Sequence, residues 1–447
     1  MMSRRSILVS NTLGGRLVLA LAVMAAVMAV QAIVGASPAL ALTERPDDTY
    51  MTNGEVYATA LSEDGKTLYI GGKFNRVREN PPGVPGISRT VSNVAAINVE
   101  TGAAIRTWRP QVTGDGAVVR SLAVKDGLVY IGGNFTAVEG EPRRNLAAVG
   151  ANTASVILSP FAPQVGGATS YVYALEADGS KLYAGGGFSK ADGEPRKNLA
   201  AFSLATGVLD PNWKPATSKA STCTDPKCGT KVRALELDST EGSIFVGGPF
   251  SYITGSNGVG DARQSVARVH TATGNLHPWK IPTGTITAPQ TAWDLTATSG
   301  RLYGGFGSGP NYLAAFHLDQ GDSGSEVWRF RTVGNVQAVA LTPDGSRLFF
   351  GGHFGINSLN QTVCNGKPLR GLASVNPAPG LISCDFVPSL DQNKRPSYEG
   401  AWPLATPNSH LWVGGGFIGV SDSINPEPAP GTGVTEAQQT NLARFTL

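Results

Sequence analysis

The sequence has few charged residues and no long helical periodicity, and these shortages narrow the class of protein. Only 15% of the 447 residues are charged, whereas 41% are hydrophobic, so the chain can form a core and is not of the disordered class. The 56 Gly and 29 Pro are too many turn formers for a helical protein. Together these features predict an all-β fold of short strands joined by many turns.

No acidic residue occurs before Glu44, and the first 41 residues differ from the rest. Three arginines precede or begin an almost wholly apolar run over 17–36, and Ala39-Leu40-Ala41 is a small-x-small cleavage site. We therefore expect residues 1–41 to be a signal peptide of a secreted, extracellular protein. A twin-arginine signal is an alternative to ordinary Sec export. The apolar run is also long enough to remain as a membrane anchor, which would place the protein at the cell surface.

The remaining chain has no excess charge of either sign. Residues 1–41 hold three arginines and no acid, so 33 basic and 33 acidic residues remain in 42–447. This balance gives no reason to expect nucleic acid or an anionic membrane as the partner. Contact with a membrane is expected only if the apolar run is retained, and we expect a monomer.

Cysteine is scarce, and its even number favours disulfides. An exported chain with Cys223, Cys228, Cys364 and Cys384 is predicted to form two bridges, between neighbours in sequence in each case. A zinc site is disfavoured because the spacings are irregular and no His lies close to either pair in sequence.

The dominant positive feature is a repeat, a hydrophobic strand that ends in Gly-Gly-x-Phe. It occurs seven times, once in altered form, with first glycines at Gly71, Gly132, Gly185, Gly247, Gly304, Gly351 and Gly414. An apolar strand precedes each copy, often across an Asp-Gly turn such as Asp64-Gly65, which is a hairpin signal. A loop follows, then a third strand such as Asn145-Leu146-Ala147-Ala148, and then an aromatic residue usually followed by Pro, as in Trp108-Arg109-Pro110.

Each unit is therefore predicted to be four short antiparallel strands, the content of a propeller blade. We predict a seven-bladed β-propeller over 42–447. Its blades are expected at about 54–112, 116–164, 170–216, 230–283, 291–331, 334–389 and 398–447. Since the last unit has only three strands, we expect residues 43–48 to supply its fourth and to close the ring. Glu44 departs from the pattern there, because Trp is usual at this place.

These repeats resemble the delta-60 repeat family of exported bacterial propellers, with its Gly-Gly-x-Phe and Arg-x-Asn-Leu-Ala-Ala phrases. The resemblance extends from about residue 43 to the end of the chain. It implies the repeat type and an extracellular propeller, but no shared catalytic residues.

Long segments collect on one face of such a propeller, where the loops after the second strand and the connections between blades lie. The longest are Asn75–Ser88, Ala216–Thr230, Tyr252–Ala262, Gly355–Pro368 and Gly419–Thr440. This long-loop face and its axial mouth are the predicted binding site, since variable loops on a rigid scaffold often carry function. We align Tyr57, Tyr171, Arg233 and Gln337 at the mouth as candidate ligand contacts, with packing between blades as the alternative.

No local motif predicts catalysis. The five His form no metal-ligand pair, although His353 occupies the variable place of one Gly-Gly-x-Phe copy. No cofactor is predicted. Glu139-Gly140-Glu141 and Asp192-Gly193-Glu194 are weak Ca²⁺ candidates without the regular spacing of a calcium loop. The sequence therefore favours a non-enzymatic binding or scaffold protein for an extracellular glycan or protein. The alternative is a hydrolase or lyase with a site assembled across blades at the channel mouth.

Overall fold

In the computed structural model the chain divides into two units, Met1–Ala41 and Leu42–Leu447. The structure describes residues 42, 44–47, 49–78, 88–153, 161–167, 170–238, 240–282, 290–355, 361–391, 400–421 and 440–447. The predicted signal peptide lies outside these residues. Within them there is no helix, and so none long and apolar enough to cross a membrane. The all-β prediction is confirmed.

Each sequence repeat forms one main sheet of consecutive antiparallel strands. The strands of the main sheets are β2 (Val56–Leu61), β3 (Thr67–Gly72) and β6 (Val94–Asn98); β8 (Val118–Lys125), β9 (Leu128–Asn134) and β12 (Leu146–Gly150); β14 (Tyr171–Ala177), β15 (Lys181–Gly187) and β18 (Leu199–Ser203); β20 (Ala234–Asp238), β21 (Ser243–Gly247) and β24 (Val266–His270); β25 (Thr291–Ala297), β26 (Arg301–Gly307), β27 (Tyr312–His317) and β28 (Glu326–Arg331); β29 (Val336–Leu341), β30 (Leu348–Gly352) and β33 (Leu372–Val375); and β35 (Ala401–Ala405), β36 (His410–Gly415) and β38 (Leu442–Thr446).

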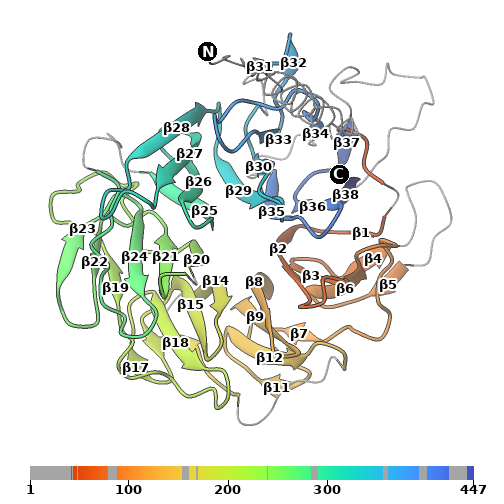
Figure 1. The fold of residues 1–447 in the computed structure, drawn as a ribbon. Helices are drawn as coiled ribbons and strands as arrows, with labels where there is room; N and C mark the ends of the chain where they lie inside the picture. Colours follow the sequence, from red (N-terminus) through yellow and green to blue (C-terminus); the bar gives the residue numbers. More distant parts are fainter. Residues whose placement is uncertain are drawn as a thin grey trace, which may run out of the picture. The chain divides into compact units, whose positions relative to one another are not determined.

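The first strands of these sheets lie innermost and form a closed cycle within Leu42–Leu447 (Figure 1). β2 contacts β8, and the contacts continue through β14, β20, β25, β29 and β35 back to β2. Sheets placed radially around such a cycle make a β-propeller.

Most main sheets have three strands, not the four that we predicted. The fourth strand is reduced to an isolated bridge, for example Ile97 with Ala104 and Phe202 with Leu209. The sheet that ends in β28 is the exception, and its Trp328 is not followed by the usual Pro.

The N-terminal segment pairs with the last strand, as the predicted ring closure requires. The contact is a single antiparallel bridge between Asp47 and Arg444 of β38, and not a continuous strand. Glu44, which replaces the usual Trp, accepts hydrogen bonds from Lys367 Nζ at 2.7 Å and Val387 N at 3.0 Å. It is therefore held by a charge and a backbone amide where Trp108, Trp213 and Trp279 bury an indole in their units.

The two glycines of each Gly-Gly-x-Phe copy are required for different structural reasons. A Cβ on Gly71 would lie 2.4 Å from Val119 in the innermost strand of the next sheet. A Cβ on Gly72 would lie 2.0 Å from the carbonyl oxygen of Glu55 in its own sheet. The first glycine thus allows adjacent sheets to pack closely, and the second allows the innermost strand to pass close to its neighbour.

The repeated Asn and Trp are also structural. Asn145 has φ of 63°, a conformation that Asn tolerates better than most residues, and its Oδ1 accepts from Phe135 N at 3.2 Å. Trp108 is 2% exposed, and its Nε1 donates to the carbonyl oxygen of Gly150 in the next sheet at 2.9 Å. Trp213 and Trp279 repeat this inter-sheet bond. The aromatic row therefore belongs to the core and is not a surface for ligands.

The segments predicted as irregular loops form small sheets of their own. Their strands are β1 (Met51–Thr52), β4 (Arg76–Arg78) and β5 (Ser88–Thr90); β7 (Val112–Thr113), β10 (Ala137–Val138) and β11 (Glu141–Pro142); β13 (Val165–Gly166), β16 (Lys190–Ala191) and β17 (Glu194–Pro195); β19 (Ala216–Ser218), β22 (Tyr252–Thr254) and β23 (Gly260–Ala262); β31 (Thr362–Val363) and β32 (Lys367–Pro368); and β34 (Ser389–Asp391) and β37 (Gly419–Ser421). In most of these small sheets, a strand from the connection between two main sheets pairs with the hairpin that follows the second strand of a main sheet. Backbone pairing therefore orders part of the long-loop face.

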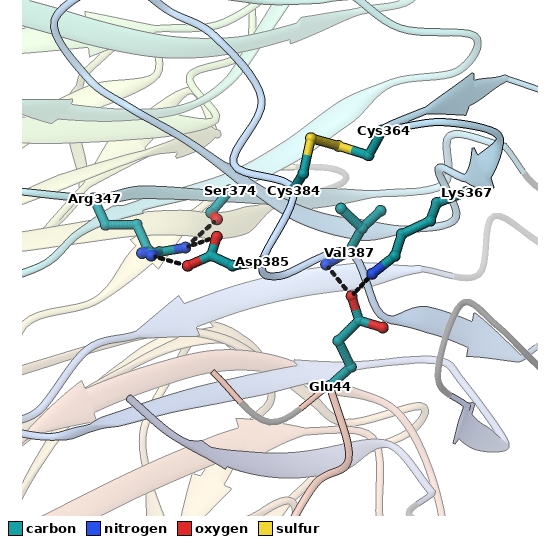
Figure 2. The surroundings of a disulfide bond; sticks show 8 residues. All are labelled: Glu44, Arg347, Cys364, Lys367, Ser374, Cys384, Asp385 and Val387. Atoms are coloured by element: carbon teal, nitrogen blue, oxygen red, sulfur yellow. Dashed lines mark hydrogen bonds and ion pairs between the residues drawn. A yellow bond between two sulfur atoms is a disulfide. The ribbon is translucent and has the colours of Figure 1, made fainter. Parts of the chain in front are cut away.

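Both predicted disulfides are present. Cys223 pairs with Cys228, and Cys364 pairs with Cys384, with Cα–Cα distances of 6.4 and 5.3 Å. Figure 2 shows the second bridge between two polar clusters. On one side Arg347 forms a two-pronged ion pair with Asp385, with bonds of 2.9 and 2.6 Å. On the other side lie Glu44 and its partner Lys367, so this bridge anchors the region that receives the N-terminal segment.

Candidate functional site

A cavity of about 450 Å³ lies at the axis, enclosed by the innermost strands. Residues of all seven innermost strands, or directly before them, line it. Its volume is within the range of small-ligand sites.

Six of the innermost strands carry the same irregularity near their first residue. The strand register shifts there, as between Val56 and Ala58 of β2, which leaves Tyr57 unpaired and directed at the axis. Arg233 lies directly before β20 at the matching place. We call this set the girdle, and its members are Tyr57, Arg120, Tyr173, Arg233, Trp293, Gln337 and Trp402.

Neighbouring girdle side chains contact one another around the axis. The Arg120 guanidinium lies 4.8 Å from the ring centroid of Tyr57 and 5.7 Å from that of Tyr173. The Arg233 guanidinium lies 4.1 Å from the Tyr173 ring and 5.0 Å from the Trp293 ring. These cation–π contacts hold both guanidiniums against aromatic faces without neutralising their charge.

The other side of the girdle is aromatic. Trp402 packs edge-on against Tyr57 at 5.6 Å and against Trp293 at 6.2 Å between ring centroids. Trp293 and Trp402 contact each other although their strands are not neighbours around the axis. The strand between theirs is β29, which carries Gln337. Gln337 is 4% exposed, and its Oε1 lies 3.2 Å from Nδ1 of His353. His353, the histidine that the sequence singled out, therefore positions a girdle side chain.

Four girdle nitrogens are enclosed by protein and have no hydrogen-bond acceptor. They are Nε of Arg120, Nε of Arg233, Nε1 of Trp293 and Nε2 of Gln337. A buried donor without a partner costs about 1–3 kcal/mol. Burial lowers the pKa of Arg233, but a guanidinium remains charged at neutral pH. The girdle is therefore a set of convergent donors, two of them cationic.

A layer of three half-buried carboxyl groups lies further along the same strands. Glu176 and Glu236 follow the girdle residues of β14 and β20 by three positions, and Asp294 directly follows Trp293. Burial raises the pKa of Glu176 to about 8 and that of Asp294 to about 7. The pKa of Glu236 is raised by burial and by the charge of Glu176. These carboxyl groups open to the cavity, yet protein surrounds them and disfavours their charged forms.

Two of the three carboxyl groups also join adjacent sheets. Glu236 Oε1 accepts from Ala297 N of β25 at 2.8 Å, and Asp294 Oδ2 accepts from Val339 N of β29 at 2.9 Å. Among the described residues, no donor bonds the carboxyl group of Glu176. Glu176 is thus the member of this layer whose position is not explained by a bond to the next sheet.

Three of the four candidate contacts line the cavity. Tyr57, Arg233 and Gln337 do so, whereas Tyr171 does not and stacks on Tyr173 at 5.5 Å. The sequence alignment of these candidates counts each one back from a Leu, which lies seven residues before the first aliphatic residue of the following strand. The turn between β14 and β15 is shorter than that between β2 and β3, so this count misplaces Tyr171 by two residues.

Sequence reasoning missed the remaining cavity residues. Counting from the second glycine of each Gly-Gly pair, which faces the residue before the bulge, aligns Tyr57 with Arg120 and Tyr173. In β25 and β26 the pair is shifted, because Gly305 and Phe306 take the places of Gly71 and Gly72. The carboxyl groups have no repeated signal. The place of Glu176 and Glu236 is Ala60 in β2 and Ala340 in β29, and the place of Asp294 is Ala58 in β2 and Ala338 in β29.

No group of three His, Cys, Asp or Glu suited to a metal ion occurs in the described part of the chain. The two Ca²⁺ candidates are turns of the hairpins β10–β11 and β16–β17. Their acids bond backbone amides instead: Glu139 accepts from Gln111 N, and Asp192 accepts from Gln164 N at 2.7 Å.

No protein-family model matches the sequence, and no curated protein matches it. Among solved structures, the chain is similar to the WD40 β-propeller domain of Doa1, with 10% identity and a TM-score of 0.47. The match covers 90% of this chain and 96% of the Doa1 domain. At this identity and TM-score the similarity carries no information on function.

Proposed function

We propose that this chain is an extracellular, non-enzymatic binding protein, a seven-bladed propeller that holds a glycan or protein partner at the girdle and the surrounding long-loop face. The observation that carries the proposal is the set of four enclosed donors without acceptors, at the mouth of a cavity of ligand size. An enclosed donor without an acceptor is costly, so a ligand that supplies acceptors to these donors gains free energy.

The long-loop face is placed to extend such a site. Val118, two residues before Arg120, pairs with Asn134 at the end of β9, and the hairpin β10–β11 leaves from that same end. Its turn residues are exposed, as is Glu194 of the next hairpin. A partner held at the girdle would therefore meet these hairpins at its periphery.

The test is binding to an array of extracellular glycans, cell-wall polymers and secreted proteins, with and without EDTA. Ala60→Trp and Ala405→Trp each place a large side chain in the cavity, on different strands, and should abolish any specific hit. Lys66→Trp adds the same side chain to the exposed β2–β3 turn and should not. No hit, or a hit that survives both cavity variants once circular dichroism shows them folded, would refute the proposal.

One observation favours a second candidate, a hydrolase or lyase at the same cavity. Glu176 and Asp294 hold protons near neutral pH, as general acids do, and Glu176 has no bond to the next sheet. Product release from an array glycan or peptide, lost in Glu176→Gln while binding is kept, would establish this alternative.

A further inference from the structure

The chemistry of the girdle specifies what its ligand must offer, and this inference rests on the proposed binding function. Gln337 is 4% exposed, and its Nε2 is enclosed without an acceptor. The Nε atoms of Arg120 and Arg233 and Nε1 of Trp293 share this condition. A ligand that satisfies these donors must therefore offer several hydrogen-bond acceptors.

Two of the donors are cationic, which favours an anionic acceptor. In the described residues neither Arg120 nor Arg233 forms an ion pair, and their charges face aromatic rings. The acids in the cavity lie beyond the girdle and retain protons near neutral pH. A carboxylate matches a guanidinium in charge and geometry, and its bonds to an ionised donor are about twice as strong as those between neutral groups.

The rings and the acid layer define the rest of the ligand. Trp402 presents an aromatic surface to the cavity, and among the described residues no guanidinium lies over it, unlike Tyr57 and Tyr173. Beyond them, Glu176 and Glu236 present carboxyl groups that can donate to or accept from hydroxyl groups. A ligand that fills both layers carries an anionic end, a flat ring and several hydroxyl groups.

We propose that the girdle binds a uronic acid residue. Its carboxylate lies at Arg120 and Arg233, its ring face lies against the girdle aromatics, and its hydroxyl groups point to the carboxyl layer. The side chain of an acidic peptide offers the carboxylate but neither the ring nor the hydroxyl groups. The residue can come from a free monosaccharide or from the end of a polymer, and both share the recognised chemistry.

The experiment is titration calorimetry of the purified protein with matched ligands. Galacturonate is compared with galactose, which has the same ring without the carboxylate, and with a trigalacturonide, which distinguishes a chain end from a free sugar. Acetate, sulfate and a Glu-rich tripeptide are the controls for a bare anion and a peptide. We expect either uronate ligand to bind at least tenfold more tightly than galactose and all three controls, with a change in the fluorescence of Trp293 and Trp402.

Variants test the assigned atoms. Arg233→Gln should weaken uronate binding by about tenfold or more, since tenfold corresponds to about 1.4 kcal/mol. Trp293→Phe keeps a ring but removes one donor, and should weaken binding severalfold. Arg109→Gln removes an exposed charge elsewhere and should have no effect.

Equal binding of galactose, equal binding of any control, an equal effect of Arg109→Gln, or no uronate binding would each overturn the inference. If the array partner is a neutral glycan or a protein and is lost in Ala60→Trp, the proposed binding function stands while the uronate assignment fails. If no array partner is found either, both fail.

Discussion

Asp47 and Arg444 lie 397 positions apart in sequence and are joined through both backbone and side chains. Asp47 N donates to the carbonyl oxygen of Arg444 at 2.7 Å, and Nε of Arg444 donates to Oδ2 of Asp47 at 2.8 Å. Nη1 of Arg444 also donates to the carbonyl oxygens of Val99 and Glu100 at 3.0 and 2.6 Å. One guanidinium therefore connects the N-terminal segment, β38 and the end of β6.

Loss of that guanidinium should loosen the ring closure. We expect Arg444→Met to lower the free energy of unfolding by about 2 kcal/mol, because it removes charge-assisted bonds from a mostly buried site. Thermal unfolding at a fixed heating rate measures the change. Arg109→Met, at an exposed position, is the control, and an equal loss in both variants would contradict the closure role.

The second glycine of the repeat should not tolerate a methyl group. Gly72→Ala places a Cβ about 2.0 Å from the backbone carbonyl of Glu55, so a backbone shift is unavoidable. We expect a loss of about 3 kcal/mol or more, or failure to fold. Gly179→Ala is the matched control, since no atom lies within 4 Å of its added Cβ, and its effect should stay within about 0.5 kcal/mol. Similar stabilities would show that the repeat glycine is not required.

The buried ion pair between Arg268 and Asp238 should contribute more to stability than an exposed pair. Arg268 and Asp238 are 3% and 7% exposed and are joined at 2.6 Å. Asp238→Ala leaves a buried charge without its partner and should cost about 3–5 kcal/mol, part of which Asp238→Ala with Arg268→Met should restore. Glu63→Ala, which breaks the exposed pair with Lys125, should cost less than about 1 kcal/mol. Chemical denaturation measures both, and comparable losses would disprove the difference.

The carboxyl layer should make stability fall as pH rises. Burial raises the pKa of Glu176 to about 8 and of Asp294 to about 7, whereas both titrate near 4 in the unfolded chain. The native state then binds more protons than the unfolded state between about pH 4 and pH 8, so this contribution is complete below the window and lost above it. The cavity is lined by three other charged groups, which belong to Glu236, Arg120 and Arg233. No His lines it.

Removal of the two acids should flatten that dependence. We expect Glu176→Gln with Asp294→Asn to gain stability relative to the wild type between pH 5 and pH 9, by at most about 1.4 kcal/mol for each acid and each pH unit. Glu141→Gln, at an exposed position, should follow the wild type. Because the comparison is a difference between variants, titration of histidines elsewhere cancels. Parallel curves for the wild type and the double variant would show that these acids are not perturbed.

Local features of the sequence determined much of the fold. The spacing of Gly-Gly-x-Phe marked each main sheet, and the even cysteine count with neighbour spacing indicated both disulfides. These features are decided by contacts that every copy of the repeat makes in the same way, such as the inter-sheet bond of Trp108. A pattern repeated along the chain therefore shows directly where each copy lies.

The site depended on differences between copies, and only the tertiary structure decided those. Which residue enters the cavity is set by a register shift of one residue, and a turn shorter by two residues moved the assignment from Tyr173 to Tyr171. Arg120, Glu176 and Trp402 are far apart in sequence and meet because their strands surround one axis. No local sequence pattern indicates that these residues lie close together. The repeat specifies the strands, whereas the residues that face the axis differ from one copy to the next.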